Sequence, residues 1–267
     1  MTLRKYLTLM RAGIIESLQF RLSFVVMVIG NILYLIVVYF LWKAIYDSAE
    51  TDIVNGMTFT DTLIYIVLAS ALFSFMEMYI VWEIGRSIQS GKIVLDLLKP
   101  MDYRKFLFWS YSGTFVSQFF LTFLPTFIAV SIVTGGAIPF GINLLYFVLS
   151  VVMAVSINYS IDFFTGTICL YTESIWGINI MKQVIVLLLS GATIPLAFFP
   201  EPLKTIMYYL PFQSIYNAPL SLLLDGNPEP QKVLTTLGTQ LAWCIGMYVI
   251  SKVFWKISLK RITVNGG

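Results

Sequence analysis

Acidic side chains inside apolar stretches are the residues of this sequence that could do chemistry. Glu77 and Asp162 each interrupt a long apolar segment, and Glu173 follows the second of these segments. A carboxylate in hydrocarbon is costly unless it is paired, protonated or facing water. One interpretation makes these acids part of a substrate path or a proton relay. The other bonds them to polar or basic groups on neighbouring helices, and it is favoured because both acids lie near the ends of their segments that adjoin basic residues.

The familiar catalytic and metal-binding arrangements are missing from the sequence. The chain has no histidine, which excludes Ser-His and Cys-His catalysis and His-based metal centres. Cys169 and Cys244 lie far apart in apolar stretches, as is typical of small buried hydrophobic residues. An intramembrane aspartyl protease would need two aspartates on facing spans, and only Asp162 is suitably placed. We therefore expect no enzyme active site, no metal site and no cofactor in this chain.

Gly91-Lys92 invites comparison with a phosphate-binding loop. A Walker A loop has four residues between its first glycine and the Gly-Lys pair, and a Ser or Thr follows the lysine. Here five residues separate Gly85 from Gly91, and Ile93 follows Lys92. The chain is therefore not expected to bind ATP.

Composition places these residues in a membrane protein. Of the 267 residues, 58% are hydrophobic and 12% are charged, against about 25% charged residues in an average soluble domain. The mean hydropathy is +0.83, and the net charge of only +3 gives no broad basic surface for nucleic acid. The sequence predicts an all-α polytopic fold with one transmembrane domain over residues 1–267 and about six spans. The expected spans are 22–42, 60–82, 108–134, 142–170, 180–198 and 237–254, with a kink at Pro125 in the third.

The lysines and arginines predict the orientation of the spans. Cytoplasmic loops near membrane spans carry the excess of these residues. With six spans, most of the 17 Lys and Arg residues fall on one side, in the N-terminus, the 83–107 loop, the 171–182 segment and the C-terminus. The protein is therefore expected in the cytoplasmic membrane, with both termini in the cytoplasm. The proline-rich 199–235 segment is expected outside the cell.

Two segments that precede or follow spans have patterns of their own. Residues 1–20 place apolar and basic side chains on opposite faces of a helix, which is typical of a helix lying among lipid headgroups. The 83–107 loop combines a short amphipathic helix with a glycine break at Gly91 and a proline at Pro100. Glu83 and Arg86 are expected to form an ion pair on the surface of that helix. Such a loop suits docking on a soluble protein, and a solvated positive loop is the simpler alternative.

Several short motifs of this chain resemble those of ABC-2 type transporter permeases. The first helix ends in Phe20-Arg21, and the inner loop has Ile88-x-x-Gly91 and Leu98-Lys99-Pro100. The outer part of the chain has the series Ser190-Gly191 to Pro195, Phe199-Pro200 and Leu210-Pro211-Phe212. The resemblance covers nearly the whole chain, and the order of the elements carries it more than any one motif. It is nearest to the bacterial branch of uncharacterised permeases that work as two related subunits with an ATPase.

The resemblance implies a type V exporter fold, in which two six-span permeases lie side by side in the bilayer and each contacts an ATP-binding cassette subunit. ATP and Mg would bind that partner. It also implies that residues 1–20 form a connecting helix, that 83–107 form the coupling loop, and that 199–235 form an outer re-entrant segment. The residues expected to couple to the ATPase are Arg86, Ile88, Gly91, Lys92, Leu98, Lys99 and Pro100. The residues expected to gate the exit are Pro195, Phe199, Pro200, Pro211 and Phe212.

Two classes of transporter remain open at this point. The favoured one is the permease subunit of an ATP-driven exporter, whose second permease is either a related subunit or a copy of this chain. The alternative is an ion-coupled secondary transporter of a hydrophobic or amphipathic solute. Inverted-repeat secondary transporters show paired interrupted helices in their two halves. The 83–107 loop has no counterpart in the second half, which favours the permease.

Overall fold

Helices make up most of the chain in the computed structural model, which describes residues 2–19, 21–49, 51–77, 79–172 and 174–261. Phe20 and Glu173 therefore lie outside the described residues. The first half contains α1 (Thr2–Gln19), α2 (Arg21–Asp47), β1 (Ile53–Val54), β2 (Met57–Thr58), α3 (Phe59–Met76), α4 (Ile80–Gln89), α5 (Lys92–Leu97), α6 (Tyr103–Gln118), the π-helical turn η1 (Phe119–Phe123) and α7 (Leu124–Val133). The second half contains α8 (Ile142–Ile168), α9 (Ile175–Leu189), η2 (Leu196–Phe198), α10 (Glu201–Tyr209), η3 (Phe212–Ser214), α11 (Asn217–Leu224), α12 (Pro230–Ser258) and η4 (Leu259–Arg261).

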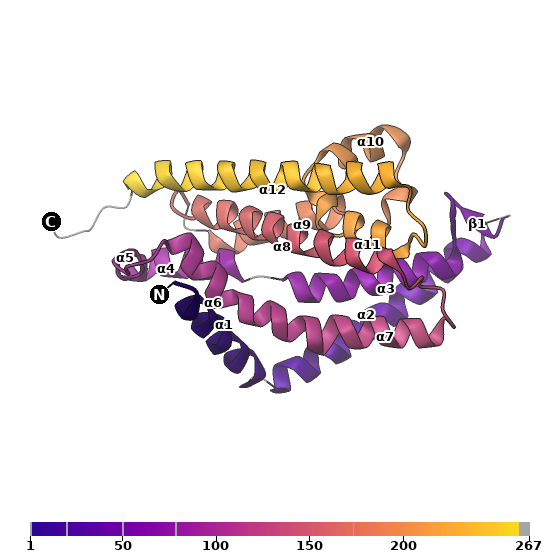
Figure 1. The fold of residues 1–267 in the computed structure, drawn as a ribbon, viewed down its shortest axis with the longest axis horizontal. Helices are drawn as coiled ribbons and strands as arrows, with labels where there is room; N and C mark the ends of the chain where they lie inside the picture. The colour runs from indigo at the N-terminus through magenta and orange to yellow at the C-terminus, as the bar shows by residue number, and fades with distance from the viewer. Residues whose placement is uncertain (1, 20, 50, 78, 173, 262–267) are drawn as a thin grey trace.

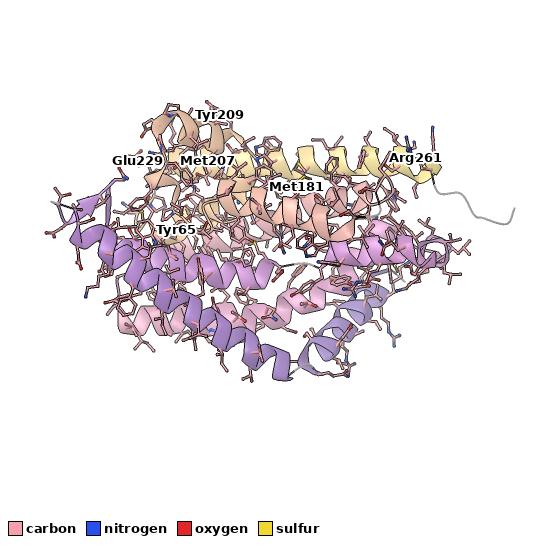
Figure 2. All side chains as sticks on the ribbon, turned by 180° about the vertical axis from the view of Figure 1, so that it is seen from behind. Tyr65, Met181, Met207, Tyr209, Glu229 and Arg261 are labelled. Atoms are coloured by element: carbon pink, nitrogen blue, oxygen red, sulfur yellow. The ribbon has the colours of Figure 1, made fainter. Side chains whose placement is uncertain are left out.

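The long helices run along the long axis of the molecule and give it two distinct ends (Figure 1). The end that carries α5 and the last turns of α12 is termed the basic end, because Lys92, Lys99, Lys256 and Lys260 lie there. The opposite end carries β1 and β2, which pair as a two-residue antiparallel hairpin. Arg261 and Tyr209 lie toward these two ends in Figure 2.

Five helical segments of the described chain are long and apolar enough to cross a membrane. They are Val28–Asp47, Phe59–Gln89, Tyr103–Val133, Ile142–Ile168 and Pro230–Arg261. The expectation of an all-α polytopic membrane fold is thereby confirmed, with the β1–β2 hairpin as a minor addition.

The fifth expected span, 180–198, differs from the prediction. Its helix is α9, which begins at Ile175, ends at Leu189 and covers about 22 Å of a hydrocarbon core about 30 Å thick. The helix stops because Gly191 takes a left-handed conformation with φ of 80°. The hydroxyl of Tyr65 on α3 donates to the Gly191 carbonyl at 3.0 Å. Of the short helices that follow, α11 is buried, whereas α10 is mostly exposed.

The second expected span is broken into α3 and α4 around Glu77, and neither proline nor glycine marks the break. Asn158 of α8 donates from Nδ2 to the carbonyl oxygen of Met76 at 2.8 Å. This bond satisfies a helix-end carbonyl that hydrocarbon would leave without a partner. The chain resumes helical structure at Ile80, so the start of the expected 83–107 loop is helix α4 and not loop.

The third span contains the expected irregularity near Pro125. The α6 helix passes into the π-helical turn η1, and Pro125 then occupies the first turn of α7. Proline lacks the backbone N–H of an interior helical residue, and a widened turn just before it accommodates that loss.

The first helix packs directly against α6. A Cβ atom added at Gly113 would overlap the carbonyl oxygen of Met10, and one added at Gly13 would overlap the α6 backbone. The two helices therefore meet backbone to backbone, as small residues allow within membranes. The hydroxyl of Ser17 donates to that of Ser117 at 2.7 Å. The large apolar side chains that α1 leaves exposed are Leu7, Ile15 and Leu18.

Candidate functional site

The α4–α5 segment at the basic end carries an apolar tip. Gly91 has φ of 72°, a left-handed conformation that turns the chain from α4 into α5. Leu95 and Leu98 then project from the segment with 66% and 76% of their surface exposed, while Asp96 between them is buried. Two large apolar side chains thus lie uncovered beyond the spans, where water would surround them if nothing docked there.

Ion pairs hold this segment in place. The ammonium group of Lys92 lies 3.2 Å from Oε1 of Glu83, whose Oε2 accepts a hydrogen bond from Tyr111 of α6 at 3.2 Å. Lys99 lies 2.7 Å from Oδ1 of Asp96. The hydrogen bond to the Glu83 carboxylate raises the pKa of Lys92 above its ordinary value, so the lysine stays charged. The tip is therefore fastened to α4 and α6.

The expected ion pair between Glu83 and Arg86 is wrong. Glu83 pairs with Lys92 because the turn at Gly91 folds α5 back toward α4. Arg86 instead places its guanidinium 5.6 Å from the ring centroid of Trp82.

The seven expected coupling residues all lie within the segment from α4 to the start of α6. Arg86, Leu98 and Pro100 are exposed, Ile88 is half-buried, and Gly91 forms the turn. The other two, Lys92 and Lys99, are held in the ion pairs described above. The expected set lacks Leu95, which shares the exposed face with Leu98. Its spacing of three residues from Leu98 could have predicted this, because residues three apart lie on the same face of a helix.

The start of α1 lies beside this segment. A groove of about 610 Å³ separates the first turns of α1 from the α5–α6 connection. The basic side chains Arg4, Lys5 and Lys99 all line it. The apolar tip is therefore flanked by a positively charged groove, and α1 and the α4–α5 segment form one continuous surface.

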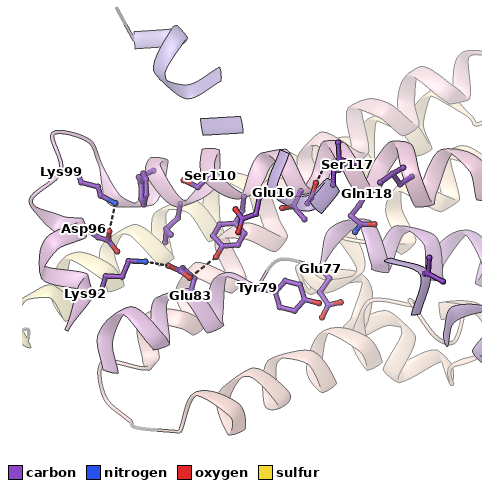
Figure 3. Close-up of a pocket in the computed structure, with 18 residues that line it drawn as sticks. Glu16, Glu77, Tyr79, Glu83, Lys92, Asp96, Lys99, Ser110, Ser117 and Gln118 are labelled. Atoms are coloured by element: carbon purple, nitrogen blue, oxygen red, sulfur yellow. Dashed lines mark hydrogen bonds and ion pairs between the residues drawn. The ribbon is translucent and has the colours of Figure 1, made fainter. Parts of the chain in front are cut away.

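A cavity of about 1040 Å³ lies behind the α4–α5 segment, between α1, the α3–α4 break and α6 (Figure 3). Four carboxylates and two ammonium groups line it, and this space is termed the acidic cavity. Since the two lysines are paired with Glu83 and Asp96, Glu16 and Glu77 leave the lining negative. Its other charged, polar and apolar lining residues include Lys92, Lys99, Ser110, Ser117, Gln118, Leu18, Leu107 and Leu121.

The lining of the acidic cavity suits binding more than catalysis. It offers carboxylates for a positive group and leucines for an apolar body. Within the described ranges, no three His, Cys, Asp or Glu side chains gather closely enough to hold a metal ion. Glu77 and Tyr79 face this space from the α3–α4 break (Figure 3), so the break itself forms part of the cavity wall.

Asp162 has a partner that its position in the sequence does not suggest. It is fully buried on α8, and the ammonium group of Lys182 on α9 lies 2.8 Å from its Oδ1. Lys182 was expected in the 171–182 segment at the end of a span, but α9 begins at Ile175 and carries this lysine inside the bundle. Asp162 is thus bonded to a basic group on a neighbouring helix, whereas Glu77 lines the acidic cavity.

The residues expected to gate the exit lie toward the opposite end, around η2, α10 and η3. Pro195 precedes η2, Pro200 precedes α10, and Pro211 precedes η3. Pro195 and Pro211 are buried, Phe199 and Phe212 are half-buried, and Pro200 is exposed. The structure therefore brings these five residues into one region but packs most of them against the protein.

Arg104 is a buried charge that was expected in the solvated 83–107 loop. It lies in the first turn of α6 with 9% of its surface exposed and donates to the hydroxyls of Ser160 and Ser251. The signal in the sequence is the run of aromatic residues beside it, which marks the start of a span and not a loop.

Residues 32–266 match the family model described as ABC-2 family transporter protein. No curated protein matches the chain. The matched range includes the α4–α5 segment, the α3–α4 break and every later helix, whereas α1 precedes it.

Proposed function

Because the chain belongs to the ABC-2 family of transporter proteins, we propose that it is the permease subunit of an exporter that a separate ATP-binding cassette subunit drives. The exposed pair Leu95 and Leu98 is the observation that carries this proposal. These two leucines lie on the same face of a charged segment outside the spans, and a contiguous exposed apolar patch is typical of a protein interaction site. The partner ATPase, with its ATP and Mg, docks there and on the adjoining positive groove.

Close packing connects this docking surface to the spans. The α4 helix packs against α8 and α9, and a Cβ atom at Gly85 would lie 2.7 Å from the side chain of Ile175. One at Gly166 of α8 would lie 2.8 Å from Ile84. Because no space is left between these helices, a push on α5 passes through α4 to α8 and α9.

The α3–α4 break supplies the relative movement that transport needs. Since α3 and α4 are separate helices, α4 moves with α5 while α3 stays with its neighbours. The acidic cavity lies at this break, so its shape follows the position of α4. The cavity receives an amphipathic solute with a positive group, and the solute leaves near Pro195 and Phe212.

The orientation of the protein in the membrane follows from the excess of lysine and arginine at the basic end. That end faces the cytoplasm, where the ATPase is, and both termini lie there in a bacterial cytoplasmic membrane. A second permease, either a related subunit or another copy of this chain, completes the path across the bilayer.

Leu98→Asp tests the docking surface. Leu98 is largely exposed, so the variant should fold normally but place a charge in the contact with the ATPase. Burying one leucine contributes about 1.5–3 kcal/mol, so we expect binding to weaken by at least about tenfold. The measurement is co-purification of an ATP-binding cassette subunit with the tagged chain, together with ATP hydrolysis by the complex.

Ile53→Asp is the matched control, because Ile53 is 59% exposed in β1 at the opposite end. This variant should retain the ATPase. Equal loss in both variants would show that the tip is not the docking site. Transport by this chain in vesicles that contain no ATPase would contradict the proposal and favour the ion-coupled class.

A further inference from the structure

A second pocket, on the side of α6 that faces α8 and α12, collects positive charge. It has a volume of about 500 Å³ and is termed the basic pocket. Arg104, Lys105 and Lys252 line it, with Asp102 as the single acid of the lining. Asp102 is already engaged, since its Oδ1 accepts the backbone N–H of Lys105 at 3.0 Å and caps α6.

The guanidinium of Arg104 has only neutral partners in this pocket. It donates to the carbonyl of Tyr248 at 3.2 Å and to the hydroxyls of Ser160 and Ser251, and it lies 4.5 Å from the centroid of the Tyr248 ring. In the part of the chain that the structure describes, no carboxylate lies within ion-pair distance of it. A buried charge of this kind calls for an anion, because hydroxyls and ring faces offset only part of its desolvation.

A second cation approaches the same ring from the solvent side. The ammonium group of Lys252 lies 5.6 Å from the Tyr248 centroid. Arg104 and Lys252 are thus neighbours of one tyrosine, and neither is in any of the ion pairs of the described residues. A negative group near both would offset the repulsion between these two like charges.

The rim of the basic pocket includes exposed side chains of a membrane-spanning helix. Ile245 and Tyr248 line it with 59% and 44% of their surfaces exposed, on a helix that crosses the membrane. Lys252 lies six residues before the end of α12, which is about 9 Å along the helix. Lysine and arginine side chains reach the headgroup region from that depth.

We propose that the basic pocket binds an anionic phospholipid. The lipid phosphate bonds to Arg104 and Lys252, Lys105 adds positive charge, and the acyl chains lie along the exposed apolar face of α12 by Ile245. Guanidinium groups bind phosphate oxygens through two parallel hydrogen bonds, and basic pockets between membrane helices bind anionic headgroups. A free phosphate ion has the negative charge of the lipid headgroup but no acyl chains. The apolar rim of the pocket therefore favours a phospholipid over free phosphate.

The test uses the purified full chain in neutral detergent and does not depend on any ATPase. Phosphatidylglycerol, phosphatidylcholine and glycerol 1-phosphate are titrated separately, and bound ligand is counted by native mass spectrometry. The variant Lys105→Gln/Lys252→Gln removes two exposed charges from the pocket and leaves the buried Arg104 in place. The control Lys256→Gln/Lys260→Gln removes two exposed charges near the same end of α12, outside the pocket.

We expect phosphatidylglycerol to bind saturably, and the pocket variant to weaken that binding by about thirtyfold, about fivefold for each lysine. The control should bind as the parent does. Equal weakening in both variants, or equal binding of phosphatidylcholine, would overturn the proposal. Glycerol 1-phosphate that binds as tightly as phosphatidylglycerol would show that the pocket takes a free phosphate and not a lipid.

Discussion

Two buried charges adjoin the same stretch of α8 and are handled in opposite ways. Asp162 is paired with Lys182 across 2.8 Å. Two residues earlier on α8, Ser160 accepts a hydrogen bond from Arg104, whose described partners are all neutral. The first charge is neutralised within the chain and the second is not.

The difference separates a charge that holds the protein together from one that is available to a ligand. A charge that is paired in a low-dielectric interior has its counter-charge supplied by the protein itself. An unpaired one keeps its attraction for whatever anion the surroundings supply. Depth alone therefore says little about function, and the presence or absence of a counter-charge says more.

Lys182→Met tests the paired charge and should have the largest effect of the substitutions considered. The substitution leaves the Asp162 carboxylate fully buried without a counter-charge, so we expect a loss of about 3–5 kcal/mol in the free energy of unfolding. Unfolding of the purified protein in detergent measures it.

Asp162→Asn/Lys182→Met is the control for that change, because it removes both charges and should recover most of the lost stability. If Lys182→Met alone were as stable as the parent, the pair would not have the structural role assigned to it.

Arg104→Met removes the other buried charge and should cost less, about 1–3 kcal/mol, since it deletes hydrogen bonds but strands no ion. Ser160 and Ser251 already donate to carbonyls of their own helices and stay satisfied. Thermal unfolding with and without phosphatidylglycerol checks this, because added lipid should stabilise the parent and not the variant. A loss as large as that of Lys182→Met would mean that Arg104 is compensated within the protein after all.

Lys232→Met removes an exposed ion pair, for comparison with the buried pair of Asp162 and Lys182. Lys232 lies 2.6 Å from Asp225, and their side chains are 47% and 31% exposed. Water screens such a pair, so we expect a loss below about 1 kcal/mol.

The hydrogen bond from Lys232 lowers the pKa of Asp225. The stabilisation is therefore present above the ordinary aspartate pKa and is lost as the pH falls through the lowered one. Unfolding from about pH 7 down to about pH 2 should bring parent and variant together. A difference that persists at the acid end would exclude the ion pair as its cause.

Hydropathy was enough to predict the long helices. The sequences of α2, α8 and α12 each contain a long, mostly apolar run, and any helix that crosses hydrocarbon needs such a run. The amphipathic pattern of residues 1–20 likewise predicted α1. The docking of α1 on α6 depends on Gly13 meeting Gly113, and a single segment cannot reveal that contact.

Charged residues and helix breaks were harder to place. Lys182 and Arg104 were assigned to loops because a charge counts against a span, yet each is held inside by groups remote in sequence. The break at Glu77 has no local signal, since Asn158 of α8 satisfies the carbonyl that the break exposes. The predicted ion pair between Glu83 and Arg86 was wrong for a similar reason. The turn at Gly91, and not spacing along α4, brings Lys92 to Glu83.

The crossing of α1 and α6 at their glycines is a point about which the first helix could rotate. The backbones meet at Gly13 and Gly113, where neither residue has a side chain to separate them. Beyond the crossing, Glu16 and Ser17 form part of the acidic cavity wall, while Leu18 is half exposed to the surroundings. A rotation of α1 about this crossing would therefore change the width of the cavity mouth.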